Sequence, residues 1–110
     1  MKIIRVKTAL KRLPKLNNEI RYRSCIETSQ FTAGLIAFRP TKESAAKQIL
    51  HKEKDVVCHV LKGRGRLRVN GRRIDLGPGT LCHIPKGTPH DFAAKKNSEL
   101  ILFYSMIKTR

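Results

Sequence analysis

Histidine and cysteine are the residue types in this sequence whose side chains could bind a metal or take part in acid–base chemistry. The chain of 110 residues contains four histidines and three cysteines. The cysteines, Cys25, Cys58 and Cys82, are odd in number and form no C-x-x-C pair. We therefore expect free thiols in the reducing cytoplasm rather than a disulfide framework or a zinc knuckle.

The overall charge is strongly basic, with 24 Lys+Arg against 8 Asp+Glu and a net charge of +16 when histidine is neutral. Most of the cations cannot find an acidic partner within the chain, so the surface field attracts anions. A nucleic acid or another polyanion is compatible with this balance. Two tyrosines, four phenylalanines and no tryptophan offer few aromatic platforms for gripping a single strand.

The basic residues are concentrated between Lys62 and Arg73, where six cations and no acid occur. Arginines at every second position of a strand project from one face. One interpretation is a solvated outer face that protects an edge strand from aggregation. The other is a track for phosphates, because the guanidinium group suits phosphate geometry. The candidate anion-binding residues are Arg64, Arg66, Arg68, Arg72 and Arg73.

The elements that must position these side chains are short apolar runs separated by turn residues, a pattern typical of all-β proteins. Asn70-Gly71 between two such runs is a strong hairpin signal. For residues 41–54 the sequence leaves open whether a helix or a strand forms, and that choice decides where His51 points. Strands are expected at residues 2–7, 20–26, 31–38, 56–61, 66–69, 72–76, 80–84, 90–94 and 99–107.

The length of the chain predicts one domain, residues 1–110. No apolar run approaches the roughly 20 residues that a membrane span needs, so no membrane partner is expected. Short strands without a βαβ rhythm favour a sandwich or a barrel.

One continuous segment carries a more specific pattern, Gly79-x5-Pro85-x-Gly87-x2-His90. It matches the second signature of the cupin family position for position, and residues 51–94 resemble a small single-domain cupin. The resemblance implies a cupin-type jelly-roll β-barrel with a small ligand cavity. Gly79 and Gly87 would take positive φ in tight turns and aim His90 inward. Cupins commonly pair through their sheets, which implies a homodimer in which residues 2–7 cross onto the partner.

The resemblance also implies a divalent metal held by two histidines and a glutamate of the first signature together with His90. That first signature is damaged here, because Val56 stands at the glutamate position and Ile49 at the first histidine, while His51 fits the second. A one-residue slip of the strand would bring in Asp55 but would turn the strand over. His51, His90 and Asp55 are thus the candidate ligands for Zn, Fe, Mn or Ni.

The leading functional hypothesis is a small-molecule-binding cupin whose pocket is floored by His90 and His51. As an enzyme it would be a metal-dependent oxygenase, isomerase or lyase. The alternative is a nucleic-acid or polyanion-binding protein, or a dimerisation module, on a cupin scaffold. Asp91 is expected to face outward. The expected pocket lining is Val56, Cys58, Val60, Cys82 and Phe92.

Overall fold

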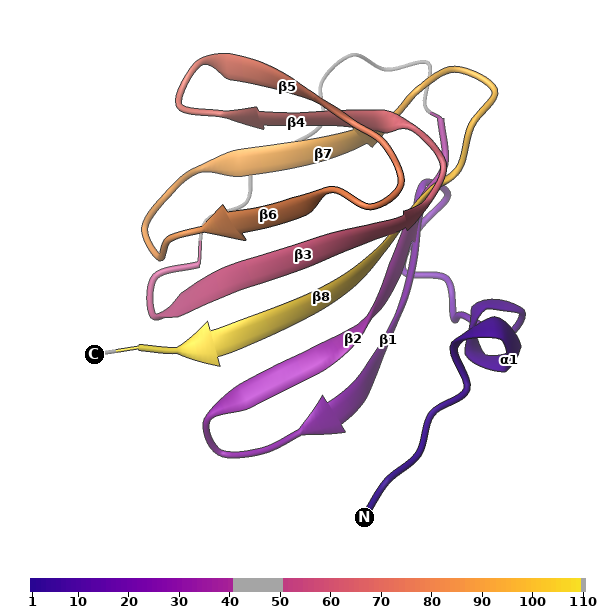
Figure 1. Cartoon of the computed structure of the whole chain (residues 1–110), viewed down its shortest axis with the longest axis vertical. Coiled ribbons are helices and arrows are strands. Elements are labelled where there is room, and N and C mark those ends of the chain that lie inside the picture. Colours follow the sequence, from indigo (N-terminus) through magenta and orange to yellow (C-terminus); the bar gives the residue numbers. More distant parts are fainter. Residues whose placement is uncertain (41–50, 110) are drawn as a thin grey trace.

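The computed structural model describes residues 1–40 and 51–109, and apart from one short helix the regular secondary structure of this part consists of antiparallel β-strands. A five-stranded sheet has the order β1 (Ile20–Glu27), β2 (Phe31–Phe38), β8 (Leu100–Lys108), β3 (Lys54–Lys62) and β6 (Leu81–Ile84). A three-stranded sheet has the order β5 (Arg72–Leu76), β4 (Gly65–Val69) and β7 (His90–Ala94). The chain passes back and forth between the two sheets, which curve around one interior (Figure 1). The predicted all-β jelly-roll barrel is confirmed.

The main core lies between the sheets and takes side chains from both. Leu67 and Leu76 come from the three-stranded sheet, and Val60, Leu100 and Leu102 from the five-stranded one. Alternate residues of β3 and β8 face this interior, as a period-two pattern predicts, whereas a bulge between Ser24 and Ile26 interrupts the alternation in β1. The question of helix or strand at residues 41–54 falls largely outside the described residues, and β3 begins at Lys54.

The hairpin predicted from Asn70-Gly71 is confirmed. Those two residues connect β4 to β5, whose register pairs Val69 with Arg72. Both turn residues have positive φ, as a two-residue hairpin of this kind requires. The cross-strand pairs place Arg66 and Arg68 on the outer face of the small sheet.

The register of β3 decides between the two readings of the damaged metal signature. Val56, Cys58 and Val60 are buried against the interior, whereas Asp55 lies on the opposite face. The structure therefore has the register that places Val56, an aliphatic residue, where the resemblance implies a glutamate. Burial of this apolar set opposes the slip, because a shift by one residue would expose it.

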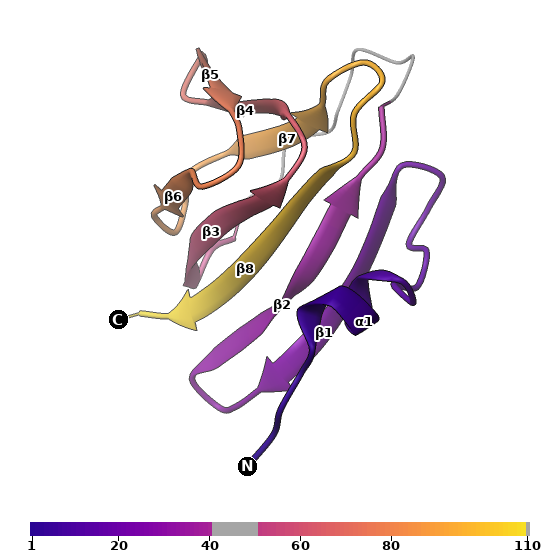
Figure 2. The same cartoon turned by 45° about the vertical axis from the view of Figure 1, so that its right-hand side comes forward.

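The prediction of a strand at residues 2–7 is wrong. A short helix, α1 (Val6–Leu10), occupies part of this segment and lies against the outer face of the five-stranded sheet (Figure 2). Ile4, Ala9 and Leu13 pack there with Leu35 of the chain's own sheet. The apolar residues are thus used at helical spacing rather than at the alternation of a strand. No helix in residues 1–40 and 51–109 has the length and apolar character to cross a bilayer.

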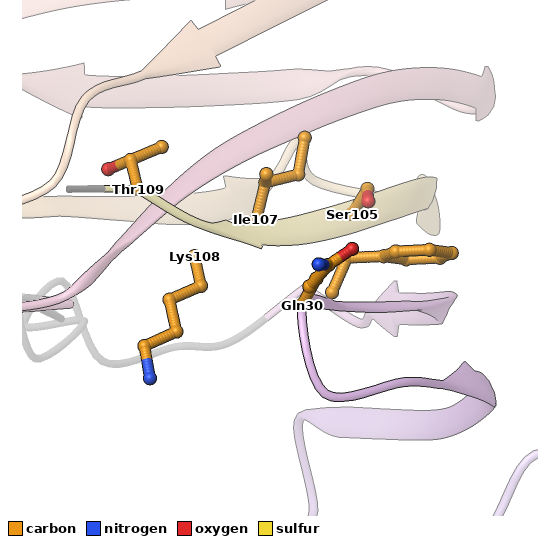
Figure 3. A pocket seen from close by; sticks show the side chains of 6 residues that line it. Gln30, Ser105, Ile107, Lys108 and Thr109 are labelled. Atoms are coloured by element: carbon orange, nitrogen blue, oxygen red, sulfur yellow. The ribbon is translucent and has the colours of Figure 1, made fainter.

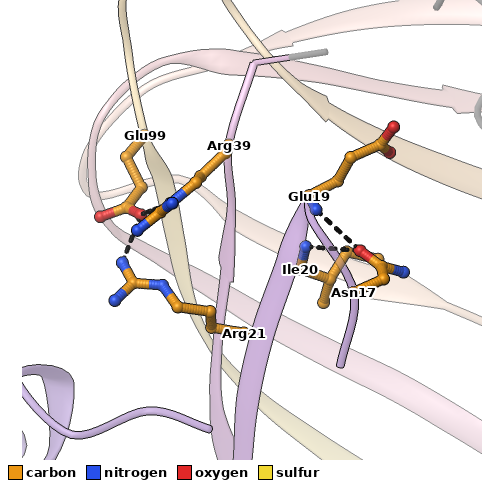
Figure 4. A network of polar contacts seen from close by, with 6 residues as sticks. All are labelled: Asn17, Glu19, Ile20, Arg21, Arg39 and Glu99. Atoms are coloured by element: carbon orange, nitrogen blue, oxygen red, sulfur yellow. Dashed lines mark hydrogen bonds and ion pairs between the residues drawn. The ribbon is translucent and has the colours of Figure 1, made fainter. Parts of the chain in front are cut away.

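Polar contacts hold three strand ends together at one end of the barrel. Arg21 of β1 and Arg39, just after β2, both reach the carboxylate of Glu99, just before β8 (Figure 4). Beside them the Asn17 side-chain carbonyl accepts hydrogen bonds from the backbone N–H groups of Glu19 and Ile20, both at 2.8 Å. These contacts tie the segment before β1 to the barrel.

Candidate functional site

An apolar cavity of about 210 Å³ lies between the two sheets. Leu16 reaches it from the loop before β1, because the Tyr22 N–H donates to the Pro14 carbonyl and folds that loop back onto the strand. Most of the wall is aliphatic or aromatic, which is typical of ligand sites oriented by a few polar groups. The lining residues are Leu16, Tyr22, Ile36, Phe38, His51, Val56, Cys58, His90, Phe92, Leu102, Tyr104 and Met106.

His90 is a buried, hydrogen-bonded polar group of the cavity. It begins β7 and is only 3% exposed. Gly87, in the turn before it, has a φ of 78°, as predicted, and its N–H donates to the His51 carbonyl at 2.8 Å. The His90 Nδ1 lies 2.9 Å from the Thr88 carbonyl oxygen, to which only a protonated Nδ1 can donate. In the neutral ring Nε2 is therefore the acceptor.

His51 faces His90 across the cavity wall, with ring centroids 5.8 Å apart. Burial, and then the neighbouring His90 and Lys54, lower the pKa of His51 below its ordinary value of 6.5. The cavity therefore presents a His51 that is neutral near pH 7 beside the ring of His90. Both histidines expected at the floor of the pocket thus line the same cavity.

Asp55 does not join the two histidines. One carboxylate oxygen accepts a hydrogen bond from the backbone N–H of Lys86, and the other lies 2.9 Å from His83 Nε2, on the outer side of β3. The hydrogen bond with His83 and that from Lys86 lower the pKa of this carboxyl group. The side chain is thus engaged away from the cavity.

The residues present do not fit the metal that the resemblance implies. Within the described residues, no three His, Cys, Asp or Glu side chains come together as a metal-binding group. Two imidazoles remain, with Val56 where a carboxylate ligand would stand, and catalytic metals in proteins are usually held by three protein ligands. Among the described residues, the two imidazoles are thus accompanied by an apolar wall rather than by a carboxylate ligand.

The expected lining residues have three different positions. Val56, Cys58 and Phe92 lie on the cavity wall, and Val60 is fully buried in the core. Cys82 lies opposite Cys58 on β6, packed against the core, but it is not part of the wall. Burial, with a smaller contribution from Cys82, raises the pKa of Cys58 to about 12, so Cys58 acts as a small apolar side chain.

Sequence reasoning missed more than half of the wall, which comes from β1, β2, β8 and the loop before β1. The available signal was the alternation along each strand, because Leu102, Tyr104 and Met106 occupy successive inward positions of β8. The missed residues are Leu16, Tyr22, Ile36, Phe38, Leu102, Tyr104 and Met106.

The five arginines predicted to bind anions lie in different environments in the structure. Asp91 faces away from the cavity as expected, but it is only 1% exposed, because Arg66 and Arg68 cover it. Arg72 lies in register with Val69, on the opposite face of β5 from Arg73. Arg64, Arg66 and Arg73 line a separate groove on the outer face of the small sheet. The five residues therefore do not form one continuous track.

A broader depression of about 720 Å³ lies at the start of β2 and the end of β8 (Figure 3). Its wall is formed by Gln30, Phe31, Ser105, Ile107, Lys108 and Thr109. Among the described residues, Lys108 is its only charged side chain, and no imidazole, thiol or carboxylate lines it. The smaller cavity with two histidines is therefore the better candidate for a functional site.

Comparisons with known proteins agree with this architecture. A family model described as "Cupin domain" matches residues 34–106. No curated protein matches the chain. The structure resembles the protein TT1209 of Thermus thermophilus, with 26% identity, 98% of each chain covered and a TM-score of 0.79.

Two further solved structures share the fold. A cupin-2 domain protein of Shewanella frigidimarina is 20% identical, with 96% of this chain and 95% of that chain covered and a TM-score of 0.75. The polyketide cyclase RemF of Streptomyces resistomycificus is also 20% identical, with 100% and 81% covered and a TM-score of 0.77. Since the family model covers most of the chain, this protein belongs to the cupin domain family.

Proposed function

We propose that this cupin binds a small, mainly apolar organic molecule with one hydroxyl group inside the barrel. The observation that carries the proposal is the cavity of about 210 Å³ whose wall is apolar apart from a few polar groups, the His51–His90 pair foremost among them. An engineered apolar cavity of about 150 Å³ binds benzene, so a space of this size is sufficient for a ring with one substituent.

The histidines define the polar end of the ligand. His90 is oriented by its Nδ1 contact to Thr88, and its Nε2 would accept a hydrogen bond from a ligand hydroxyl. His51, neutral because its pKa is lowered, offers no cation to hold a carboxylate. A neutral hydroxyl compound therefore suits the site better than an organic anion, whose desolvation would go uncompensated. The apolar walls from β2 and β8 would contact the rest of the ring.

Similar barrels support a ligand-binding role without identifying the ligand. The likeness to the polyketide cyclase RemF is one of fold, and a shared fold does not transfer an activity. The same Nε2 could take a proton from a bound hydroxyl compound, but binding is the function that the cavity itself supports.

Isothermal titration with phenol, and with toluene as the analogue that lacks the hydroxyl, tests the proposal. We expect phenol to bind wild type, with about a tenfold loss on His90→Ala, the effect of one hydrogen bond to a buried group. Toluene should bind equally to both proteins. Met106→Trp, which fills the cavity, should abolish binding of both compounds.

His59→Ala is the matched control, because this half-buried histidine lies on the outward side of β3 and does not line the cavity. Binding of phenol that survives Met106→Trp would place the ligand elsewhere and would overturn the proposal. Absence of binding by phenol and toluene alike would do the same.

A further inference from the structure

We infer that the groove on the outer face of the three-stranded sheet binds the phosphate backbone of duplex nucleic acid, independently of sequence. This function is separate from the cavity and does not rest on it. The groove has a volume of about 430 Å³ and lies where β4, β5 and the turn after β7 meet. Its cationic lining is Arg64, Arg66, Arg73, Lys95 and Lys96, and the one carboxylate among its described lining residues is Asp75.

Backbone contacts hold two separate basic segments side by side. The Lys95 N–H donates to the Arg64 carbonyl at 2.9 Å, and the Arg64 N–H donates to the Ser98 hydroxyl oxygen at 2.9 Å. The turn after β7 is thereby fixed against the turn before β4. Cations more than 30 positions apart in the sequence are thus brought to one groove. The run of basic residues between Lys62 and Arg73 does not by itself predict this arrangement.

Paired and free cations can be told apart within this surface. Asp91 already holds Arg66 and Arg68, at 2.6 Å and 2.9 Å. Arg64, Arg73, Lys95 and Lys96 are exposed, and none of the ion pairs between described residues involves them. These four side chains are therefore the ones available to an external anion. Phosphate oxygens suit both the guanidinium fork and the ammonium group.

The composition of the lining favours a duplex backbone over other phosphate compounds. In the part of the chain that the structure describes, no aromatic residue lines the groove, so it has no platform for stacking a base of a single strand or a mononucleotide. The groove also lies within a wider basic field, because the whole chain carries +16. An extended polyanion can use that wider field, whereas a single small phosphate cannot.

Fluorescence anisotropy with a short labelled DNA duplex of mixed sequence provides the test. The variant is Arg64→Glu/Lys95→Glu, and the control is Lys2→Glu/Lys7→Glu, which reverses as many exposed charges away from the groove. We expect the groove variant to weaken binding at least about tenfold and the control less than about threefold at moderate salt. Between about 50 and 200 mM salt, the slope of log K against log salt should fall by about two in the groove variant.

Three results would overturn the inference. The first is no duplex binding by wild type at low salt. The second is an equal loss in both variants, which would show a diffuse field with no site. The third is tighter binding of ATP than of the duplex, with ATP displacing the duplex, which would identify a small phosphorylated ligand instead. Thermal unfolding of each variant verifies folding.

Discussion

Asp91 of β7 lies directly opposite Arg68 of β4, and its buried carboxylate joins that arginine to Arg66 two positions away. Both Nε and Nη2 of Arg68 reach Oδ2, while Nη1 of Arg66 reaches Oδ1. One acid therefore compensates part of the charge of two neighbouring arginines on the same strand. Without it, those cations would face each other on one side of β4.

Asp91→Asn is expected to lower the free energy of unfolding by about 2 kcal/mol, because it removes the charge that two partly buried arginines share. This loss of stability is smaller than the loss expected on breaking a fully buried ion pair, because the Arg68 side chain is 42% exposed. Urea unfolding monitored by circular dichroism measures the change. Asp75→Asn on the neighbouring strand is the control, because Asp75 is exposed, and it should change stability by less than about 0.5 kcal/mol. Equal effects of the two substitutions would contradict the role assigned to Asp91.

The lowered pKa of His51 predicts a loss of stability in mild acid. Its pKa in the folded state lies below the ordinary value of 6.5 because of burial, His90 and Lys54. The unfolded state therefore binds a proton more readily, so the contribution is fully present above pH 6.5 and is lost as the pH falls through the folded-state pKa. Urea unfolding at a series of pH values below neutrality should show this decline in wild type.

The same series with His51→Gln isolates the histidine. The variant should show a smaller decline over this window, because glutamine does not titrate, while His59→Gln should retain the wild-type profile. A decline of unchanged size in His51→Gln would assign it to another group.

Gly34→Ala is expected to destabilise the protein by at least about 2 kcal/mol, because overpacking a tight site forces the backbone to shift. A Cβ at this position would lie 2.2 Å from the Arg23 carbonyl oxygen and 2.8 Å from the Tyr104 hydroxyl. Tyr104→Phe removes only the second contact and should rescue little. Thermal and urea unfolding measure both variants.

The control for this substitution is Gly71→Asn, in the hairpin turn. A Cβ there would meet no atom within 4 Å, and asparagine tolerates the positive φ of 74°. The change in stability should stay below about 0.5 kcal/mol. A Gly34→Ala protein as stable as the Gly71→Asn protein would show that β1 and β2 can separate freely at this point.

Local patterns in the sequence predicted those parts of the fold that local geometry decides. Asn70-Gly71 specifies its own turn, and the alternation in β3 specifies which residues face inward. The spacing of Gly87 and His90 likewise predicted a buried histidine at the start of a strand. In β1 a bulge between Ser24 and Ile26 interrupts the predicted alternation, and Cys25 is buried in the outer cluster that contains Ala9. The N-terminal segment was mispredicted because Ile4 and Val6 alternate with charge, while packing of Ala9 against the sheet selects a helix.

The composition of the site depended on contacts between distant segments. Leu16 and Tyr104 meet at the cavity although the chain between them crosses both sheets. The burial of Asp91 depends on Arg66 and Arg68 of another strand. The residues next to Asp91 in the sequence do not indicate that its side chain is buried. The basic groove likewise arises only when the turn containing Lys95 docks beside Arg64. Such juxtapositions follow from strand order, which single-sequence patterns do not specify.

The position of β8 between β2 and β3 also governs how the barrel can assemble. Phe31 of β2 pairs with Ile107, and Lys54 of β3 pairs with Lys108. Neither β2 nor β3 can therefore complete its pairing until β8 is present. During synthesis, β2 and β3 would each present an open edge until residues 100–108 leave the ribosome. Loops that close over such long separations slow folding, so docking of β8 is the step that should limit its rate.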